Sequence, residues 1–216
     1  MEREFWIERW RLNQIGFHQA DYNERLLRHW AALNVPAGAR VFVPLCGKSR
    51  DMWWLTARGH SVVGVELVPA AAEAFFAEAS APYERRQAGA FVAYEGMNVR
   101  ILCGDVFDVS ADHLAGVRGA FDRGALVALP PPMRRRYVAH VLDILPIGAA
   151  TLLLTVEYDQ RRADGPPFAV HGDEVEALYG ARCAIDLLDR TPAEMPPRFD
   201  AVGARGESTY RIVKTR

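Results

Sequence analysis

The stretch RVFVPLCGKS, Arg40 to Ser49, decides the fold because an apolar run passes directly into a short turn. Valine, phenylalanine and leucine dominate Arg40–Leu45, which is typical of a buried strand. A helical pattern follows over Ser49–Arg58 and ends at Gly59. The next strand, Ser61–Glu66, and the next helix, Pro69–Ala79, repeat this order. The alternation predicts a doubly wound α/β sheet, mostly parallel, with helices on both faces.

The remaining chain fits the same pattern. The other expected elements are two helices within 5–30 broken near 13–16, a hairpin over 91–105 turning at 95–98, a strand ending at 119–122, a helix over 132–145, a strand over 150–158, a helix over 173–179, and strands over 184–188 and 208–214. The ligand of such a sheet binds beyond the carboxyl ends of the strands, where the strand order reverses. Candidate site residues are therefore those that directly follow a strand.

The turn ends in Gly47-Lys48-Ser49, like a phosphate-binding P-loop. That motif needs its first glycine at position 42, where this chain has Phe42 inside the expected strand. A dinucleotide fingerprint needs three glycines, and this turn offers Gly47 alone. The turn therefore favours a ligand that has an adenosine part but no phosphates.

Acidic side chains follow the next two strands. Glu66 comes roughly twenty residues after the first turn, where nucleoside sites place the partner of the ribose. Its two oxygens match two adjacent ribose hydroxyls. Asp105, in GDVF, stands beside the apolar Val106 and is a candidate for the adenine amino group. An acid that merely caps a helix is the competing reading for Glu66, but Pro69 already begins that helix. Together these features favour S-adenosylmethionine over NAD.

Composition limits the class of protein. The chain has 216 residues, 50% hydrophobic and 25% charged, with a formal net charge of −1. This charge gives no attraction to nucleic acid or to an anionic membrane, so we expect neither partner. The amino terminus lacks an apolar signal core, and the apolar stretch 144–156 is too short to span a bilayer. We therefore expect a reduced, cytoplasmic monomer that acts on a small molecule.

Other reactive residues have simpler interpretations. The three cysteines are widely spaced, which argues against disulfides and zinc, and the histidines show no metal-ligand spacing. Cys46 is interpreted as a packing residue rather than a nucleophile, since no histidine or acid lies near it in sequence. The run Arg134-Arg135-Arg136 is interpreted as a solvated helix face. We expect no metal site.

Sequence blocks in order along nearly the whole chain resemble the thiopurine S-methyltransferase family in its bacterial form. The blocks are Trp6 and Trp10, IGFH at 15–18, VPLCGKS at 43–49, GHSVVGVE at 59–66, DRGALVA at 122–128 and GPPF at 165–168. These blocks are not shared by methyltransferases at large, so the resemblance is specific. It weakens after Asp189.

The resemblance implies a Rossmann-like methyltransferase fold. Residues 1–216 would form one S-adenosylmethionine-dependent domain, with 1–33 as an N-terminal helical lid. By position, the resemblance assigns Trp10 and Phe17 to the lid side of the cofactor, Leu45 to the first turn, Glu66 to the ribose, Asp105 and Val106 to the adenine, Arg123 to the methionine end and the acceptor, and Arg205 to the acceptor pocket.

The resemblance also implies the reaction. Methyl transfer from S-adenosylmethionine would go to the sulfur of thiopurines and similar aromatic or heterocyclic thiols, and Arg123 would stabilise the acceptor thiolate. One alternative is methylation of selenium or tellurium compounds, such as a selenol, in metalloid detoxification and resistance. From another class, the alternative is a non-catalytic nucleotide-binding module.

Overall fold

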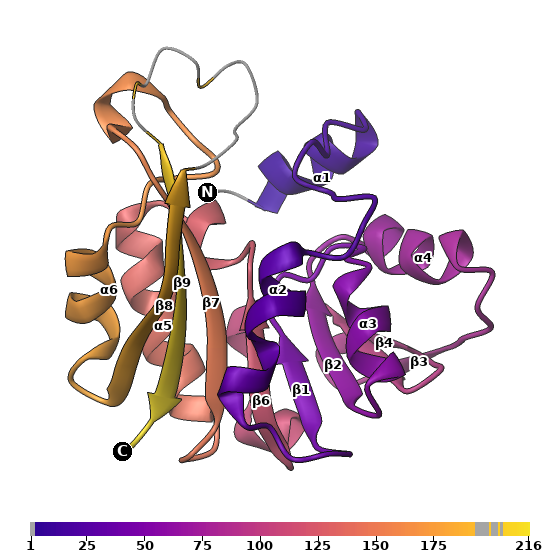
Figure 1. The fold of residues 1–216 in the computed structure, drawn as a ribbon. Helices are drawn as coiled ribbons and strands as arrows, with labels where there is room; N and C mark the ends of the chain where they lie inside the picture. The colour runs from indigo at the N-terminus through magenta and orange to yellow at the C-terminus, as the bar shows by residue number, and fades with distance from the viewer. Residues whose placement is uncertain (1–2, 193–198, 200–202, 204) are drawn as a thin grey trace.

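The computed structural model describes residues 3–192, 199, 203 and 205–216. This part of the chain forms a nine-stranded sheet in the order β3-β4-β5-β2-β1-β6-β7-β9-β8 (Figure 1). The strands are β1 (Arg40–Val43), β2 (Ser61–Glu66), β3 (Glu84–Ala88), β4 (Phe91–Gly96), β5 (Val99–Cys103), β6 (Val117–Asp122), β7 (Ala150–Glu157), β8 (Cys183–Pro192) and β9 (Gly206–Lys214).

The centre of the sheet is parallel and its two edges are antiparallel. Strands β5, β2, β1, β6 and β7 pair in parallel, whereas β3 with β4, β4 with β5, β7 with β9 and β8 with β9 are antiparallel. Strand order reverses between β1 and β6, so the carboxyl ends of these two strands mark the expected ligand position. The predicted doubly wound, mostly parallel sheet is confirmed.

Helices cover both faces of the sheet. They are α1 (Arg3–Arg11), α2 (Glu24–His29), α3 (Asp51–Ala57), α4 (Pro69–Glu78), α5 (Pro131–Ile144) and α6 (Gly172–Tyr179). In β1, Val41 and Val43 pack with buried residues of α2, α3 and α4, while Phe42 packs with residues of α5 and α6. Alternate side chains of a strand point to opposite faces, so β1 contributes to both cores. Helix α1 lies beyond the ends of the central strands (Figure 1).

Two boundaries differ from the sequence prediction for local reasons. Strand β1 ends at Val43 rather than Leu45, because Pro44 has no amide to donate and Leu45 has a φ of 45°. The break between the first two helices is longer than expected. Helix α2 begins after Asn23, whose side chain accepts hydrogen bonds from the amides of Arg25 and Leu26.

Strand β3 is missing from the prediction. Its residues, ERRQA, are polar and largely exposed, so they carry neither apolar alternation nor β-branched side chains. The strand forms because its backbone pairs with β4 over the register Glu84↔Glu95 to Ala88↔Phe91. Charged side chains at such an edge discourage pairing with another chain.

The solvated interpretation of Arg134 is wrong. Its side chain is 1% exposed, and its Nη1 donates to both carboxylate oxygens of Glu174 at 2.7 Å. Its Nε donates to the carbonyl of Leu129 at 2.7 Å. The error arose because this position faces α6 rather than solvent. Arg135 and Arg136 are exposed, as expected.

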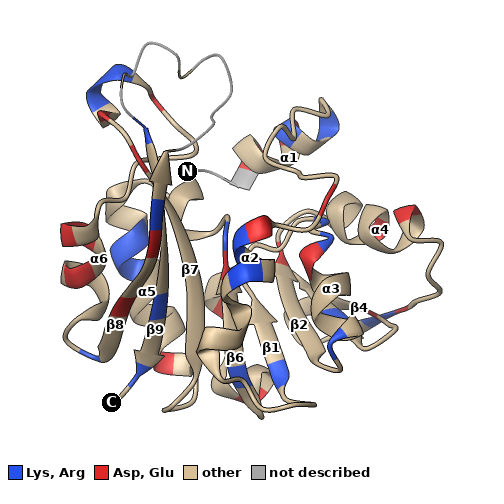
Figure 2. Ribbon diagram, in the orientation of Figure 1, with Lys and Arg blue, Asp and Glu red and all other residues tan. Residues whose placement is uncertain are grey.

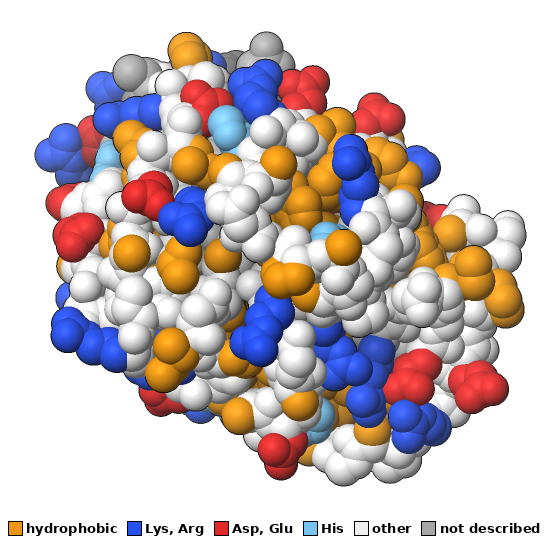
Figure 3. Space-filling view, turned by 60° about the horizontal axis from the view of Figure 1, so that its bottom comes forward, with side chains coloured by type: hydrophobic (Ala, Val, Ile, Leu, Met, Phe, Trp, Pro, Cys, Tyr) orange, Lys and Arg blue, Asp and Glu red, His pale blue; other side chains and the backbone are white. Residues whose placement is uncertain are grey.

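Charges of both signs are distributed over the molecule. Blue and red segments occur on helices and strands throughout the ribbon (Figure 2), and the two signs are interspersed on the face in Figure 3. Within the described residues, no helix combines the length and apolar character needed to cross a bilayer.

Candidate functional site

The turn after β1 is held against the start of the next strand–helix unit. The amide of Cys46 donates to the carbonyl of Val65 at 2.9 Å. This approach requires glycine at position 64, because a Cβ there would stand 2.7 Å from the sulfur of Cys46. Leu45 and Gly47 both have positive φ, 45° and 52°. Left-handed backbone is unfavourable for leucine, and such geometry is common at ligand sites.

Glu66 fixes this turn from the end of β2. Its side chain is buried, Oε2 accepts the Gly47 amide at 2.9 Å, and Oε1 accepts the Val68 amide at 2.8 Å. Burial raises the pKa of Glu66 above its ordinary value, and hydrogen bonds from backbone amides oppose that rise. Each carboxylate oxygen can accept a further hydrogen bond, so Glu66 can hold the turn and a ligand together.

The end of β5 lies directly beside Glu66. The amide of Gly104 donates to the backbone carbonyl of Glu66 at 2.8 Å. Asp105 follows with an exposed side chain that accepts the Phe107 amide at 2.9 Å and begins a short 3-10 helix. Val106 is partly buried. The two residues predicted for the adenine are therefore adjacent to the residue predicted for the ribose.

Aromatic side chains of the N-terminal segment cover the turn. The Cζ2 atom of Trp10 lies 3.5 Å from the place a Cβ would take on residue 47. Phe17 contacts Trp6 and Trp10 edge-on, with ring centroids 5.9 and 6.1 Å apart. The Phe17 side chain remains 44% exposed. The N-terminal segment therefore rests on the β1 turn and leaves part of Phe17 accessible.

Arg123 connects the N-terminal segment to the end of β6. Its Nη1 donates to the carbonyl of Phe17 at 3.0 Å, and its Nε lies 3.7 Å from Oδ2 of Asp51. Burial lowers the pKa of Arg123, while attraction to Asp51 and Glu207 opposes that change. Arginine stays charged in proteins even when buried, so this side chain places a fixed cation at the switch point.

Arg205 lies elsewhere among the strand ends. It lines a cavity of about 690 Å³ at the ends of β7, β8 and β9, together with Glu157, Tyr158, His171 and Arg190. Arg123 is not among the lining residues of this cavity. The structure thus brings Trp10, Phe17, Leu45, Glu66, Asp105, Val106 and Arg123 to one end of the sheet, with Arg205 in a neighbouring cavity.

Cys46 is a poor candidate for a nucleophile. Burial raises the pKa of the Cys46 thiol well above its ordinary value, so the thiolate is disfavoured. Its sulfur instead fills the space beside Gly64. In the part of the chain that the structure describes, no group of three or more His, Cys, Asp or Glu side chains is arranged to hold a metal ion.

Sequence reasoning missed Asp51. Its side chain is 2% exposed, and it accepts hydrogen bonds from the Asn23 amide and the Ser49 hydroxyl, each at 2.8 Å. An aspartate in the first turn of a helix is common because it offsets the helix dipole. The sequence therefore carries no signal that separates this residue from an ordinary helix start.

Comparison with known sequences gives a consistent result. A family model described as thiopurine S-methyltransferase matches residues 1–215. A thiopurine S-methyltransferase of Nitrosospira multiformis is 47% identical over 218 residues, covering 100% of this chain and 99% of that protein. One from Pseudomonas entomophila is 46% identical over 216 residues, covering 99% and 100%.

Solved structures support the fold. A Burkholderia thailandensis 1,6-didemethyltoxoflavin-N1-methyltransferase, solved with 1,6-didemethyltoxoflavin and S-adenosylhomocysteine, matches with a TM-score of 0.65 at 18% identity, covering 99% of this chain and 87% of that one. A TehB-like SAM-dependent methyltransferase from Corynebacterium glutamicum matches with a TM-score of 0.58 at 18% identity, covering 99% and 98%.

Proposed function

The chain belongs to the thiopurine S-methyltransferase family and is an S-adenosylmethionine-dependent methyltransferase, and we propose that its acceptors are thiopurines and similar aromatic or heterocyclic thiols. The observation that carries this proposal is a continuous series of contacts. It runs from Glu66 to Gly47, from Gly47 to Trp10, from Trp10 to Phe17, and from Phe17 to Arg123. A strand-end acid, an aromatic cover and a fixed cation thus surround one position.

The residues present fit an adenosine cofactor without phosphates. Glu66 retains acceptor capacity for two ribose hydroxyls, and the β1 turn has no P-loop geometry to hold a phosphate chain. We assign Leu45 to the first turn, and Asp105 with Val106 to the adenine. Trp10 and Phe17 would cover the cofactor from the lid, which we assign to residues 1–33 of a single domain.

When bound, S-adenosylmethionine supplies a methyl carbon on a positively charged sulfur, which is already a good leaving group. The protein therefore needs no metal or covalent intermediate for this transfer. Its main contributions are alignment of the acceptor with the methyl group and exclusion of water by the lid. Trp10 and Phe17 provide the apolar cover for both tasks.

Arg123 is the candidate for acceptor activation. An ionised thiol is a stronger nucleophile than a neutral one, and a fixed guanidinium stabilises that anion. Arginine cannot remove the proton itself, because it stays protonated. Water would take the proton. Arg205, from the neighbouring cavity, is proposed to approach the acceptor from its other side.

A second candidate acceptor class is selenium or tellurium compounds. Selenolates are soft anions like thiolates, so the same cation would serve them, and metalloid resistance would be the cellular role. The other alternative, a non-catalytic nucleotide-binding module, is wrong, because the family model and the relatives that match nearly the whole chain are methyltransferases. We further propose that the protein is a cytoplasmic monomer and that nucleic acid is not a partner, consistent with its formal net charge of −1.

The acceptor class can be tested with a panel assay. Purified protein is incubated with S-adenosylmethionine and thiopurines, aliphatic thiols, a selenol and a tellurium oxyanion, and methylated products are measured. We expect the highest turnover with aromatic and heterocyclic thiols. Calorimetric titration with S-adenosylmethionine, NADH and ATP accompanies the assay. Binding of S-adenosylmethionine with no methylated product from any thiol in the panel would contradict the proposed acceptor class.

The lid makes a separate prediction about dynamics. Amide hydrogen exchange over residues 4–19 should slow severalfold when S-adenosylhomocysteine is added, because Trp10 and the exposed Phe17 gain an apolar partner. Exchange over α5 serves as the internal control, since that helix packs on the other face of the sheet. Equal exchange of the lid with and without ligand would make the N-terminal helix a rigid scaffold.

A further inference from the structure

Asp51 is a buried acid at which the lid and Arg123 meet. It lies in the first turn of α3, and its side chain is 2% exposed. Oδ1 accepts the amide of Asn23 at 2.8 Å, and Oδ2 accepts the hydroxyl of Ser49 at 2.8 Å. Oδ2 also faces Nε of Arg123 at 3.7 Å. Both oxygens of this carboxylate are therefore in use.

The contact with Asn23 fixes the end of the non-helical stretch between α1 and α2. Asn23 caps α2 with its side-chain oxygen, so its own backbone amide needs an acceptor from outside that helix. Asp51 is that acceptor. This hydrogen bond attaches Asn23, the last residue before α2, to the first turn of α3.

The contact with Arg123 closes a ring through the lid. Arg123 donates from Nη1 to the carbonyl of Phe17 and lies against Asp51 through Nε. Residues 17–23 are therefore held at one end by Arg123 and at the other by Asp51, and these two side chains are ion-paired. Within the described residues these two interactions use Nη1 and Nε of Arg123, and we assign Nη2 to the ligand.

We propose that Asp51 is a positioning residue that couples closure of the lid to the orientation of Arg123. The inference rests on the proposed function, because it assigns the oriented nitrogen to the acceptor or cofactor. A buried carboxylate attracts a nearby cation more strongly than a surface carboxylate does, because water screens their charges less. The short side chain of Asp51 limits the rotation of the guanidinium, and movement of residues 17–23 is transmitted to Arg123 through the same ring.

Asp51→Asn tests the charge with little change in shape. The asparagine carbonyl still accepts the Asn23 amide, whereas its NH2 group replaces the oxygen that attracts Arg123 and can donate to the Ser49 hydroxyl instead of accepting from it. We expect turnover at saturating cofactor to fall about fivefold, a coupling typical of contacting residues. The dissociation constant for S-adenosylhomocysteine should change less than turnover. In the ligand-free protein, exchange of amides 17–23 should accelerate, which is a readout independent of activity.

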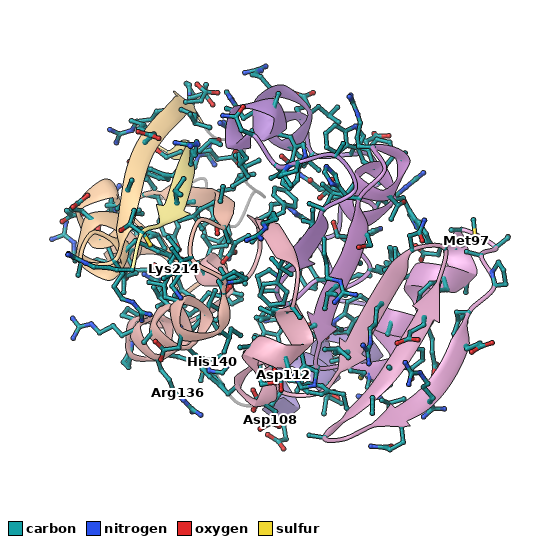
Figure 4. The ribbon with its side chains drawn as sticks, turned by 90° about the horizontal axis from the view of Figure 1, so that it is seen from below. Met97, Asp108, Asp112, Arg136, His140 and Lys214 are labelled. Atoms are coloured by element: carbon teal, nitrogen blue, oxygen red, sulfur yellow. The ribbon has the colours of Figure 1, made fainter. Side chains whose placement is uncertain are left out.

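A double-mutant cycle separates coupling to Arg123 from the purely structural contacts of Asp51 with Asn23 and Ser49. If Asp51 acts through Arg123, the variant carrying Asp51→Asn and Arg123→Lys should lose little more turnover than Arg123→Lys alone, and the two changes should also be non-additive in unfolding free energy. Asp112→Asn is the matched control. Asp112 is exposed and lies, with the labelled Asp108, Arg136 and His140, at the edge of the molecule away from the N-terminal helices (Figure 4).

The outcomes distinguish this inference from the proposed function. Additive losses in turnover and in unfolding free energy, with exchange over 17–23 unchanged, would overturn the positioning role and leave Asp51 as a structural acceptor for the Asn23 amide and the Ser49 hydroxyl. If unaltered protein methylates no acceptor, the exchange and unfolding measurements still decide the coupling. Suppose that the unfolding free energies are non-additive and the exchange of amides 17–23 changes, but no acceptor is methylated. The connection between Asp51 and the lid would then be retained, and the proposed acceptor chemistry would be rejected.

Discussion

Replacement of Glu66 by glutamine should weaken S-adenosylmethionine binding by roughly 10- to 100-fold. Hydrogen bonds to a charged group contribute about 1.5–3 kcal/mol, and each 1.4 kcal/mol corresponds to about a tenfold change in dissociation constant. Glutamine offers a single acceptor oxygen, whereas the carboxylate already accepts the amides of Gly47 and Val68. The substitution therefore reduces acceptor capacity for the ribose and loosens the β1 turn. Calorimetric titration of the folded variant measures the effect.

Acidification provides an independent test of the same residue. Because burial raises the pKa of Glu66 above its ordinary value of 4.5, protonation should begin to weaken cofactor binding at a higher pH than for an exposed glutamate. The effect on stability has the opposite sign. The folded state holds this proton more tightly than the unfolded chain, so the contribution of Glu66 to stability falls as pH rises through the folded pKa. Weaker binding on acidification therefore cannot come from loss of the Glu66 contribution to folding.

Glu176→Gln is a suitable control, since Glu176 is exposed on α6. Glu66→Ala is less informative, because it leaves two backbone amides without their acceptor at about 1–3 kcal/mol each. Affinity of Glu66→Gln equal to that of the unaltered protein, at neutral and at lower pH, would remove Glu66 from the cofactor site.

The part of the site that sequence reasoning reached depends on strand ends. Glu66 and Arg123 could be placed because one ends a strand and the other directly follows a strand, in a pattern that predicts a parallel sheet. The structure brings both to the carboxyl ends of the strands beside the point where strand order reverses. Their contacts could not be anticipated. The carboxylate of Glu66 reaches back to the Gly47 amide, which is a tertiary contact between successive strand–helix units.

Residues whose role depends on partners from other helices or loops could not be identified from the sequence. Asp51 contacts a lid residue on one side and a residue after β6 on the other, and no periodicity connects those positions. The burial of Arg134 could not be predicted for the same reason, because it depends on an ion pair with Glu174 of a different helix. Charged residues look solvated in a sequence unless their partners are known, since partners make burial tolerable.

Replacement of Arg123 by lysine should lower turnover at saturating cofactor by about tenfold or more, the effect of losing roughly 1.4 kcal/mol of transition-state stabilisation. Lysine keeps the charge but presents one nitrogen instead of a planar fork. It cannot contact the Phe17 carbonyl, face Asp51 and point a further donor at an acceptor from fixed positions, as the guanidinium does. Steady-state kinetics with saturating S-adenosylmethionine measures the loss. Arg135→Lys, on the exposed face of α5, is the matched control.

Acceptors of graded acidity separate activation of the thiol from binding of the cofactor. If Arg123 stabilises the acceptor anion, the deficit of Arg123→Lys should be largest for thiols that are mostly protonated at the assay pH. It should shrink for heterocyclic thiols that are already ionised with their charge spread over the ring, because these need less help from a fixed cation. Suppose instead that the variant only raises the apparent dissociation constant of the cofactor, and does so equally for every acceptor. Arg123 would then be a ligand of the cofactor, and activation of the thiol would have to come from another group or from solvent.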